Sequence, residues 1–90
     1  MKFTIIVEEL AQEHFQKIKK SGNKASLKKL NKILAELEEH PKTGIGNPEQ
    51  LKYNLLSLWS RRINSKDRLI YEIIEEPDNL VVIVSALGHY

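Results

Sequence analysis

Hydrophobic and polar positions follow two different periods along this chain, and the change of period predicts its elements. Short runs rich in β-branched and aromatic residues predict four strands, over Lys2–Val7, Leu55–Ile63, Arg68–Glu75 and Leu80–Leu87. Between the first two strands, apolar residues recur at helical spacing. They predict one helix over Glu8–Lys20 and a second from an N-cap at Asn23 to about Glu39. The segment Pro41–Gln50 holds two prolines and two glycines and predicts a loop.

Both predicted helices carry one apolar stripe that needs a surface to cover it. The stripes consist of Leu10, Ala11, His14, Phe15 and Ile18 in the first helix and Leu27, Leu30, Ile33, Leu34 and Leu37 in the second. Short connectors between the last three strands favour antiparallel hairpins. The sequence therefore predicts a single α+β domain over residues 1–90. Two N-terminal helices pack on one face of a four-stranded, mainly antiparallel sheet, in the order strand, helix, helix, strand, strand, strand.

Alternation along the strands indicates which side chains point away from the helices. Arg68 lies on the opposite face from Leu69 and Tyr71, so we expect it to point to the open face. In the strand before it, Ser60 and Arg62 oppose Trp59, Arg61 and Ile63. We expect a concave basic surface there, bordered by the loop that carries Glu49 and the tail that carries His89. The last strand is apolar on both faces, which is typical of a central strand or of one whose second face meets a partner.

Charged residues are distributed unevenly, although the net charge is only +2. Seven lysines and no acid occupy residues 17–32, and six basic residues accompany Glu49 and Asp67 between Lys42 and Arg68. Two basic regions in a nearly balanced chain favour contact with a polyanion. Lysines on a helix are equally typical of a solvated surface, and this alternative stays open for residues 17–32.

The composition limits the kinds of site and the cellular location that we expect for the protein. The chain has no cysteine, so it forms no disulfide and no thiolate zinc site. No apolar run is long enough for a signal peptide or a membrane span, and we expect a cytoplasmic protein. The three histidines lack ligand spacing, so we predict no metal site and no cofactor.

Residues able to carry chemistry gather in the second half of the chain. A turn-rich loop holds Glu49 and Lys52, the strand-like runs hold arginines, and the chain ends on His89-Tyr90. Phosphodiester cleavage without a metal requires an acid–base pair and an electrostatic clamp, which a carboxylate, an imidazole and a guanidinium supply.

Five pieces of sequence, in this order, resemble the YoeB/Txe-type toxins of the RelE superfamily. They are Gly44-x-Gly46-x-Pro48-Glu49-x-Leu51-Lys52, Asn54-Leu55, Trp59-Ser60-Arg61-Arg62-Ile63, Arg68-Leu69-Ile70-Tyr71 and His89-Tyr90. The first half matches only in its layout of one strand and two helices. The chain departs from the family pattern at Leu56-Ser57-Leu58, where Ser-Gly-Phe is usual, and at Asp67 and Leu87, where basic residues or histidine are frequent.

The resemblance implies a RelE-like fold, related to small microbial ribonucleases, and a toxin of a type II toxin–antitoxin system. Such toxins are ribosome-dependent, metal-independent endoribonucleases that cut messenger RNA in the ribosomal A site and inhibit translation. The implied partners are messenger RNA on the ribosome and a cognate acidic antitoxin of the YefM/Axe type. A homodimer is a further expectation, because the second face of the last strand is apolar.

By the same resemblance, the catalytic residues are Glu49, Arg68, His89 and Tyr90. Lys52 and Arg62 match supporting basic positions, and we expect Lys52, Arg61 and Arg62 to bind the RNA backbone.

The 2′-hydroxyl of RNA supplies the nucleophile, so the protein must move protons and stabilise charge. Glu49 is the candidate general base and His89 the candidate general acid, and the two roles are interchangeable because a histidine serves in either. Arg68 would clamp the phosphate, and Tyr90 would stack on a base or orient His89. Two other functions stay open: a non-catalytic RNA- or protein-binding module on the same fold, and a free-standing ribonuclease that cuts naked RNA.

Overall fold

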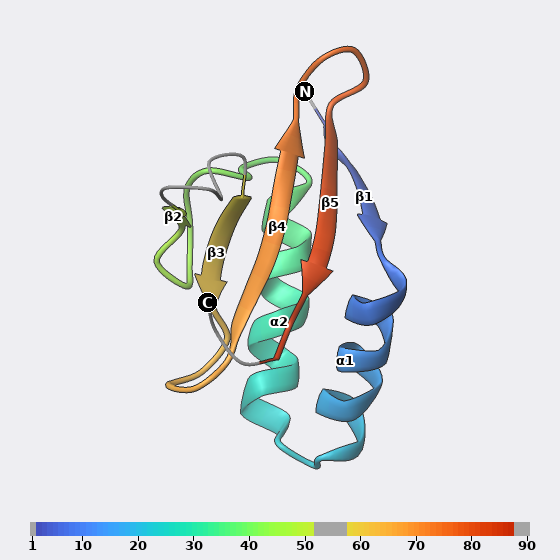
Figure 1. Cartoon of the computed structure of the whole chain (residues 1–90). Coiled ribbons are helices and arrows are strands. Elements are labelled where there is room, and N and C mark those ends of the chain that lie inside the picture. The colour runs from blue at the N-terminus through green and yellow to red at the C-terminus, as the bar shows by residue number, and fades with distance from the viewer. Residues whose placement is uncertain (1, 52–57, 88–90) are drawn as a thin grey trace.

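The computed structural model describes residues 2–51 and 58–87 (Figure 1). In chain order the elements are β1 (Thr4–Val7), α1 (Glu9–Lys20), α2 (Lys24–Leu37), β2 (Glu49–Gln50), β3 (Leu58–Arg62), β4 (Arg68–Ile74) and β5 (Leu80–Ser85). The α+β class and both predicted helices are confirmed. No helix in these two ranges combines the length and the apolar character needed to cross a bilayer.

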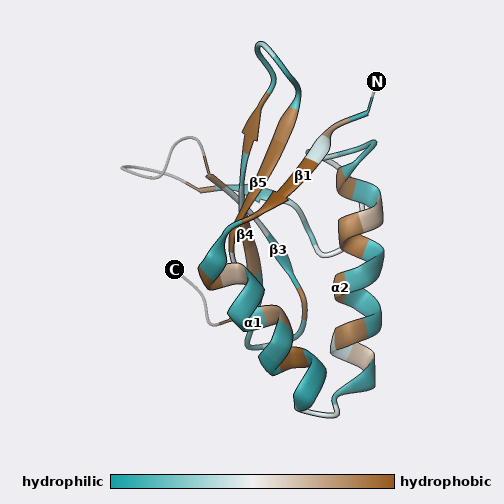
Figure 2. Ribbon diagram, turned by 90° about the vertical axis from the view of Figure 1, so that its right-hand side faces the viewer, coloured by the Kyte–Doolittle hydropathy of each residue, from teal (hydrophilic) through white to brown (hydrophobic). Residues whose placement is uncertain are grey.

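The two helices form a hairpin whose ends follow the local sequence. The Asn23 Oδ1 atom accepts a hydrogen bond of 3.1 Å from the backbone N–H of Ser26, which confirms the predicted N-cap of α2. α2 ends at Leu37, shortly before Pro41. The helices lie side by side and run in opposite directions on one side of the sheet (Figure 2).

The sheet has five strands in the order β1-β5-β4-β3-β2, so the prediction of four strands is corrected. β1 pairs with β5 in parallel, and the other neighbours are antiparallel. The additional strand is β2, an edge strand inside the segment predicted as a loop. Two polar residues show no strand period, and only their pairing with Ser60 and Trp59 makes Glu49–Gln50 a strand. β5 has a neighbour on each side, which confirms the interior position predicted from its apolar faces.

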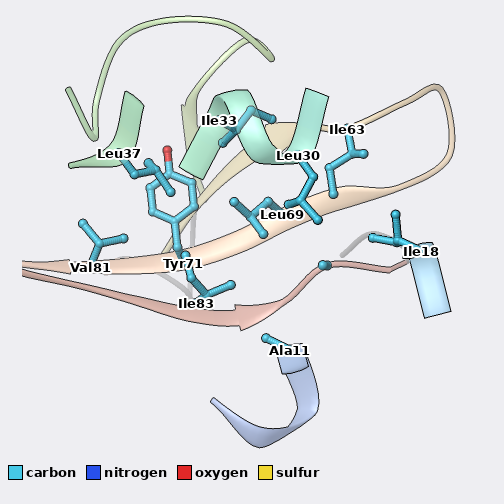
Figure 3. Packing of buried hydrophobic residues seen from close by; sticks show 11 residues of the cluster. Ala11, Ile18, Leu30, Ile33, Leu37, Ile63, Leu69, Tyr71, Val81 and Ile83 are labelled. Atoms are coloured by element: carbon cyan, nitrogen blue, oxygen red, sulfur yellow. The ribbon is translucent and has the colours of Figure 1, made fainter. Parts of the chain in front are cut away.

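The core fills the space between the helices and one face of the sheet (Figure 3). Its buried residues come mainly from both helices and from β4 and β5, and they include Ala11, Ile18, Leu30, Ile33, Leu37, Leu69, Tyr71, Val81 and Ile83. Burying one large apolar side chain contributes roughly 1.5–3 kcal/mol. Because strand residues alternate, fixing these side chains inward also fixes which residues the sheet presents on its other face.

The open face of the sheet, opposite the helices, divides into an apolar and a polar part. The cross-strand pairs Ile6–Val82 and Ile74–Leu80 place apolar side chains on β1, β5 and β4, where Ile6 is 42% exposed. The polar part lies over β2, β3 and the start of β4, and its residues are Glu49, Ser60, Arg62 and Arg68. The predicted basic open face is therefore confined to one half of the sheet.

Candidate functional site

Glu49 and Arg68 lie together on the polar part of the open face. Glu49 belongs to the edge strand β2 and Arg68 begins β4, with β3 between them. Their side chains form an ion pair, with 3.5 Å between Arg68 Nη1 and Glu49 Oε1. The glutamate side chain is 57% exposed and the arginine side chain 28%, so both groups are open to a ligand. An exposed pair of this kind contributes at most about 1 kcal/mol to stability.

Ser60 in β3 lies beneath the Glu49–Arg68 ion pair, between the strands that carry the two residues. It is the register partner of Glu49 on one side and of Ile70 on the other. Its buried hydroxyl accepts a long hydrogen bond of 3.4 Å from Arg68 Nη1. The small side chain lets the guanidinium cross β3 diagonally toward Glu49. Sequence reasoning placed Ser60 on the correct face but gave it no role in the site.

Arg62 lies directly opposite Arg68 in the β3–β4 ladder, and its side chain is exposed. Its backbone N–H donates to the carbonyl of Gly46 at 2.6 Å, so the loop before β2 is fastened to this strand. The placement is compatible with phosphate binding, and RNA contact by Arg62 stays a prediction.

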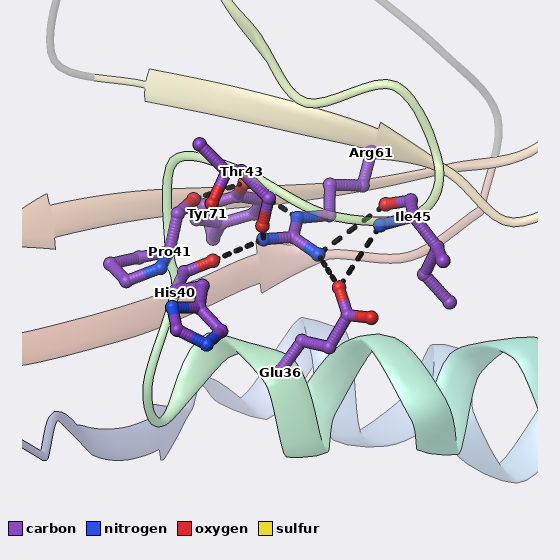
Figure 4. Close-up of polar contacts among 7 residues, drawn as sticks. All are labelled: Glu36, His40, Pro41, Thr43, Ile45, Arg61 and Tyr71. Carbon is purple, nitrogen blue, oxygen red and sulfur yellow. Dashed lines mark hydrogen bonds and ion pairs between the residues drawn. The ribbon is translucent and has the colours of Figure 1, made fainter.

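Arg61, also predicted to bind RNA, is fully buried on the helix side of the sheet (Figure 4). Its guanidinium donates to the Glu36 carboxylate at 2.8 Å and to the Tyr71 hydroxyl at 3.2 Å. The remaining contacts are to the backbone carbonyls of His40, Thr43 and Ile45. All five N–H groups of the guanidinium therefore have a protein partner, and none is left for a phosphate. The expectation that Arg61 binds RNA is wrong.

In the network around Arg61, Glu36 stays ionised and Tyr71 stays neutral, because their pKa values shift in opposite directions. Burial raises the pKa of Glu36. Hydrogen bonds from the Ile45 N–H and from Arg61 together lower it by more, so the pKa lies below its ordinary value. Burial raises the pKa of Tyr71 despite the nearby guanidinium. Its neutral hydroxyl donates to the carbonyl of Pro41 at 2.9 Å.

The network fastens the loop that leads into β2. Arg61 binds three of its carbonyls, and the Ile45 N–H donates to Glu36 Oε1 at 3.0 Å. Gly44 adopts a φ of 126°, and a Cβ there would overlap the Glu36 carboxylate. Arg61 thus supports the position of Glu49 from the opposite face of the sheet.

Three predicted site residues, Lys52, His89 and Tyr90, lie outside the described residues, and their roles stay predictions. The last described residues are tied to α1 by His14, whose Nδ1 atom accepts from the backbone N–H groups of Ala86 and Leu87 at 3.0 and 3.2 Å. This confirms that His14 is a packed, hydrogen-bonded histidine. The sequence pattern placed it on the apolar side of α1 but could not identify its partners.

The pair on the open face has the groups for acid–base chemistry on a phosphodiester. A carboxylate can take a proton from a hydroxyl, and a guanidinium beside it can hold two phosphate oxygens at once. Among the residues that the structure describes, no cluster of three His, Cys, Asp or Glu side chains is suited to a metal ion.

This fold, with an acid–arginine pair on an open sheet face, is that of the small bacterial toxins with a RelE/ParE-like fold. The structure of the YoeB dimer from Staphylococcus aureus superposes with a TM-score of 0.82 and 34% identity over all of both chains. Residues 8–90 match the family described as the YoeB-like toxin of bacterial type II toxin–antitoxin systems, and the chain belongs to that family.

Two further relatives support this assignment. Toxin YoeB from Synechocystis sp. is 44% identical over 69 residues, which cover 77% of each chain. The heterotetrameric YoeB–YefM toxin–antitoxin complex from Staphylococcus aureus contains a chain that superposes with a TM-score of 0.79 and 34% identity over all of both chains.

Proposed function

We propose that this toxin is a ribosome-dependent endoribonuclease that cleaves messenger RNA in the ribosomal A site. The observation that carries the proposal is the Glu49–Arg68 pair, exposed on the polar part of the open sheet face. An exposed ion pair contributes little to stability, so stability does not explain why an acid and a guanidinium are in contact there. A role in function does.

In the proposed reaction, Glu49 removes the proton from the 2′-hydroxyl while Arg68 neutralises the charge that develops on the phosphate. His89 protonates the leaving 5′-oxygen, and Tyr90 stacks on a base or orients His89. The reverse assignment, with His89 as base and Glu49 as acid, uses the same groups. A general acid or base typically contributes roughly 10²–10⁴-fold.

The small number of catalytic groups is the reason for proposing help from the ribosome. Holding the message in a reactive geometry replaces part of the acceleration that additional side chains would supply. A protein with this site alone is therefore expected to act on positioned message and only poorly on free RNA. A free-standing ribonuclease would show no such difference.

We also propose that an acidic antitoxin binds over the basic site and blocks access by RNA. The guanidinium groups of Arg62 and Arg68 would suit its carboxylates. The Staphylococcus aureus relative forms a complex with YefM, and a second structure of it is a dimer. For a dimer of this chain, the apolar part of the open face around Ile6 and Val82 is the available surface.

The proposal is tested by cleavage of a defined message with and without ribosomes. The wild-type protein, Glu49→Ala, His89→Ala and the control Glu39→Gln are compared, since Glu39 is exposed in the turn after α2 and lies outside the predicted site. Wild type and control should cut ribosome-bound message, and the two site variants should be at least about 10²-fold slower. Undiminished cleavage by the site variants would refute the assigned roles. Equal rates on naked and ribosome-bound RNA would instead indicate a free-standing ribonuclease.

A further inference from the structure

A second basic feature adjoins the Glu49–Arg68 pair at the turn between β3 and β4. A hollow of about 180 Å³ opens there and is lined by Arg62, Asn64, Ser65, Lys66 and Arg68. Three of these side chains are cationic and none is acidic. A volume of this size holds several water molecules, each of which occupies about 30 Å³ in the liquid, and so accommodates a phosphate group.

The hollow concentrates positive charge that the described residues neutralise only in part. Arg62 and Arg68 are direct cross-strand partners, an arrangement that is destabilising for like charges. Arg68 is paired with Glu49, but within residues 2–51 and 58–87 neither Arg62 nor Lys66 forms an ion pair. An anionic ligand would relieve the repulsion that the ladder imposes.

The β3–β4 turn holds this arrangement in place. The Asn64 Oδ1 atom accepts from the backbone N–H groups of Lys66 and Asp67 at 2.8 and 2.7 Å. The Asn64 Nδ2 group donates to Ser26 on α2 at 2.9 Å. The turn is therefore anchored to the helix layer, and Lys66 extends from a fixed backbone.

The one acid of this turn, Asp67, is absent from the lining of the basic hollow. Asp67 is only 9% exposed and accepts from Asn64 Nδ2 at 3.1 Å. It lines the larger hollow between the turn and the helix hairpin, and it is not part of the lining of the smaller one. The carboxylate next to Arg68 in sequence thus lines only the larger hollow, whereas Lys66 lines both.

We propose that this hollow binds a second phosphodiester of the RNA, adjacent to the phosphate held by Arg68, and that Lys66 is its specific ligand together with Arg62. The identity of the ligand as RNA rests on the proposed function. Lys66 is not among the residues that resemble the toxin family, and it is proposed as a ligand only because it lines the hollow. Its contact is electrostatic, so it supplies affinity and register for the strand and no base recognition.

The test measures binding of a short RNA whose 2′-hydroxyl at the cleavage site is replaced by hydrogen, so that affinity is obtained without cleavage. Wild type, Lys66→Gln and the control Lys2→Gln are titrated between about 50 and 200 mM salt. Lys2 is also exposed, and it precedes the end of β1 that pairs with Leu80, far along the sheet from the turn. Removing one phosphate contact should lower the slope of log K against log salt by about 0.7 in Lys66→Gln alone.

A second set of oligonucleotides locates the contact. One phosphate at a time is replaced by an uncharged methylphosphonate, first on one side of the cleavage site and then on the other. Neutralising the phosphate in the hollow should weaken binding by wild type several-fold and weaken binding by Lys66→Gln less, because only the contact with Arg62 is left to lose. An unchanged salt slope in Lys66→Gln, an equal loss in Lys2→Gln, or the absence of any such position overturns the proposal. Cleavage plays no part in these measurements, so failure of the Glu49 and His89 assignments is detected separately.

Discussion

Arg61 and Arg62 are neighbours in β3, yet their side chains lie on opposite faces of the sheet. Arg61 is fully buried with all its donors bound, whereas Arg62 is exposed opposite Arg68. The two arginines therefore have separate tasks: Arg61 supports the loop before β2, and Arg62 adds charge to the open face. A matched pair of substitutions separates these tasks.

Arg61→Met should destabilise the fold, and Arg62→Met should not. Without Arg61, the part-buried Glu36 carboxylate loses its ionic partner, and we expect a loss of about 3–5 kcal/mol in the free energy of unfolding. Arg62→Met should change it by no more than about 0.5 kcal/mol while weakening RNA binding. Urea unfolding and RNA titration measure the two effects. Equal destabilisation by both variants would contradict the assignment.

Glu36 should make stability depend on pH in the acid range. Its pKa is lower in the folded protein than the ordinary value of 4.5, so the folded state binds fewer protons there than the unfolded state. Its stabilisation is present above about pH 4.5 and is lost as the pH falls through the folded-state pKa. The stability difference between wild type and Glu36→Gln should therefore be largest near neutral pH and shrink in acid. Unfolding curves at several pH values, with Glu39→Gln as control, test this sign.

Gly44→Ala should disturb the loop more than an alanine at a glycine with free space around it. The new Cβ would overlap the Glu36 carboxylate, and we expect a loss of roughly 1–3 kcal/mol beyond backbone strain. Gly22→Ala is the matched control, since Gly22 also has a positive φ, of 77°, and no atom within 4 Å of a Cβ. Thermal unfolding of the two variants gives the combined cost of the overlap and of the φ of 126° at Gly44, which is the less accessible of the two to alanine. If the Gly44 variant were the more stable, the packing of this loop against Glu36 would be refuted.

Arg68→Lys should impair cleavage and spare the fold. Lysine keeps the charge but loses the two-pronged contact with phosphate oxygens, and removal of one such donor commonly costs about 10²–10³ in rate. Its exposed ion pair contributes little to stability, so the melting temperature should hardly change. Glu75→Gln, which breaks the similarly exposed Lys42–Glu75 pair of 3.3 Å, serves as control. Single-turnover cleavage of ribosome-bound message is the measurement, and wild-type rates for Arg68→Lys would exclude a clamp at this position.

The positions of the helices, the interior strand and the open-face residues follow from sequence periodicity. Apolar stripes at helical spacing and strict alternation in strands are local patterns, and burial of their apolar sides leaves few ways to arrange them. The same alternation grouped Arg61 with Trp59 and Ile63, which was a signal that it faces the core. The expectation that Arg61 binds RNA rests on its positive charge, and charge does not report which face of the sheet a side chain occupies.

The sequence alone determined the α+β class, the toxin family resemblance and the placement of Arg68 and Arg62 on one face. Only the tertiary structure decided that β2 joins the sheet as a fifth strand, that β1 runs parallel to β5, and that Arg61 is enclosed by Glu36, Tyr71 and three loop carbonyls. These features depend on hydrogen-bond partners that are distant in the chain. A periodic pattern reports which side of an element is buried, but not which distant group meets it there.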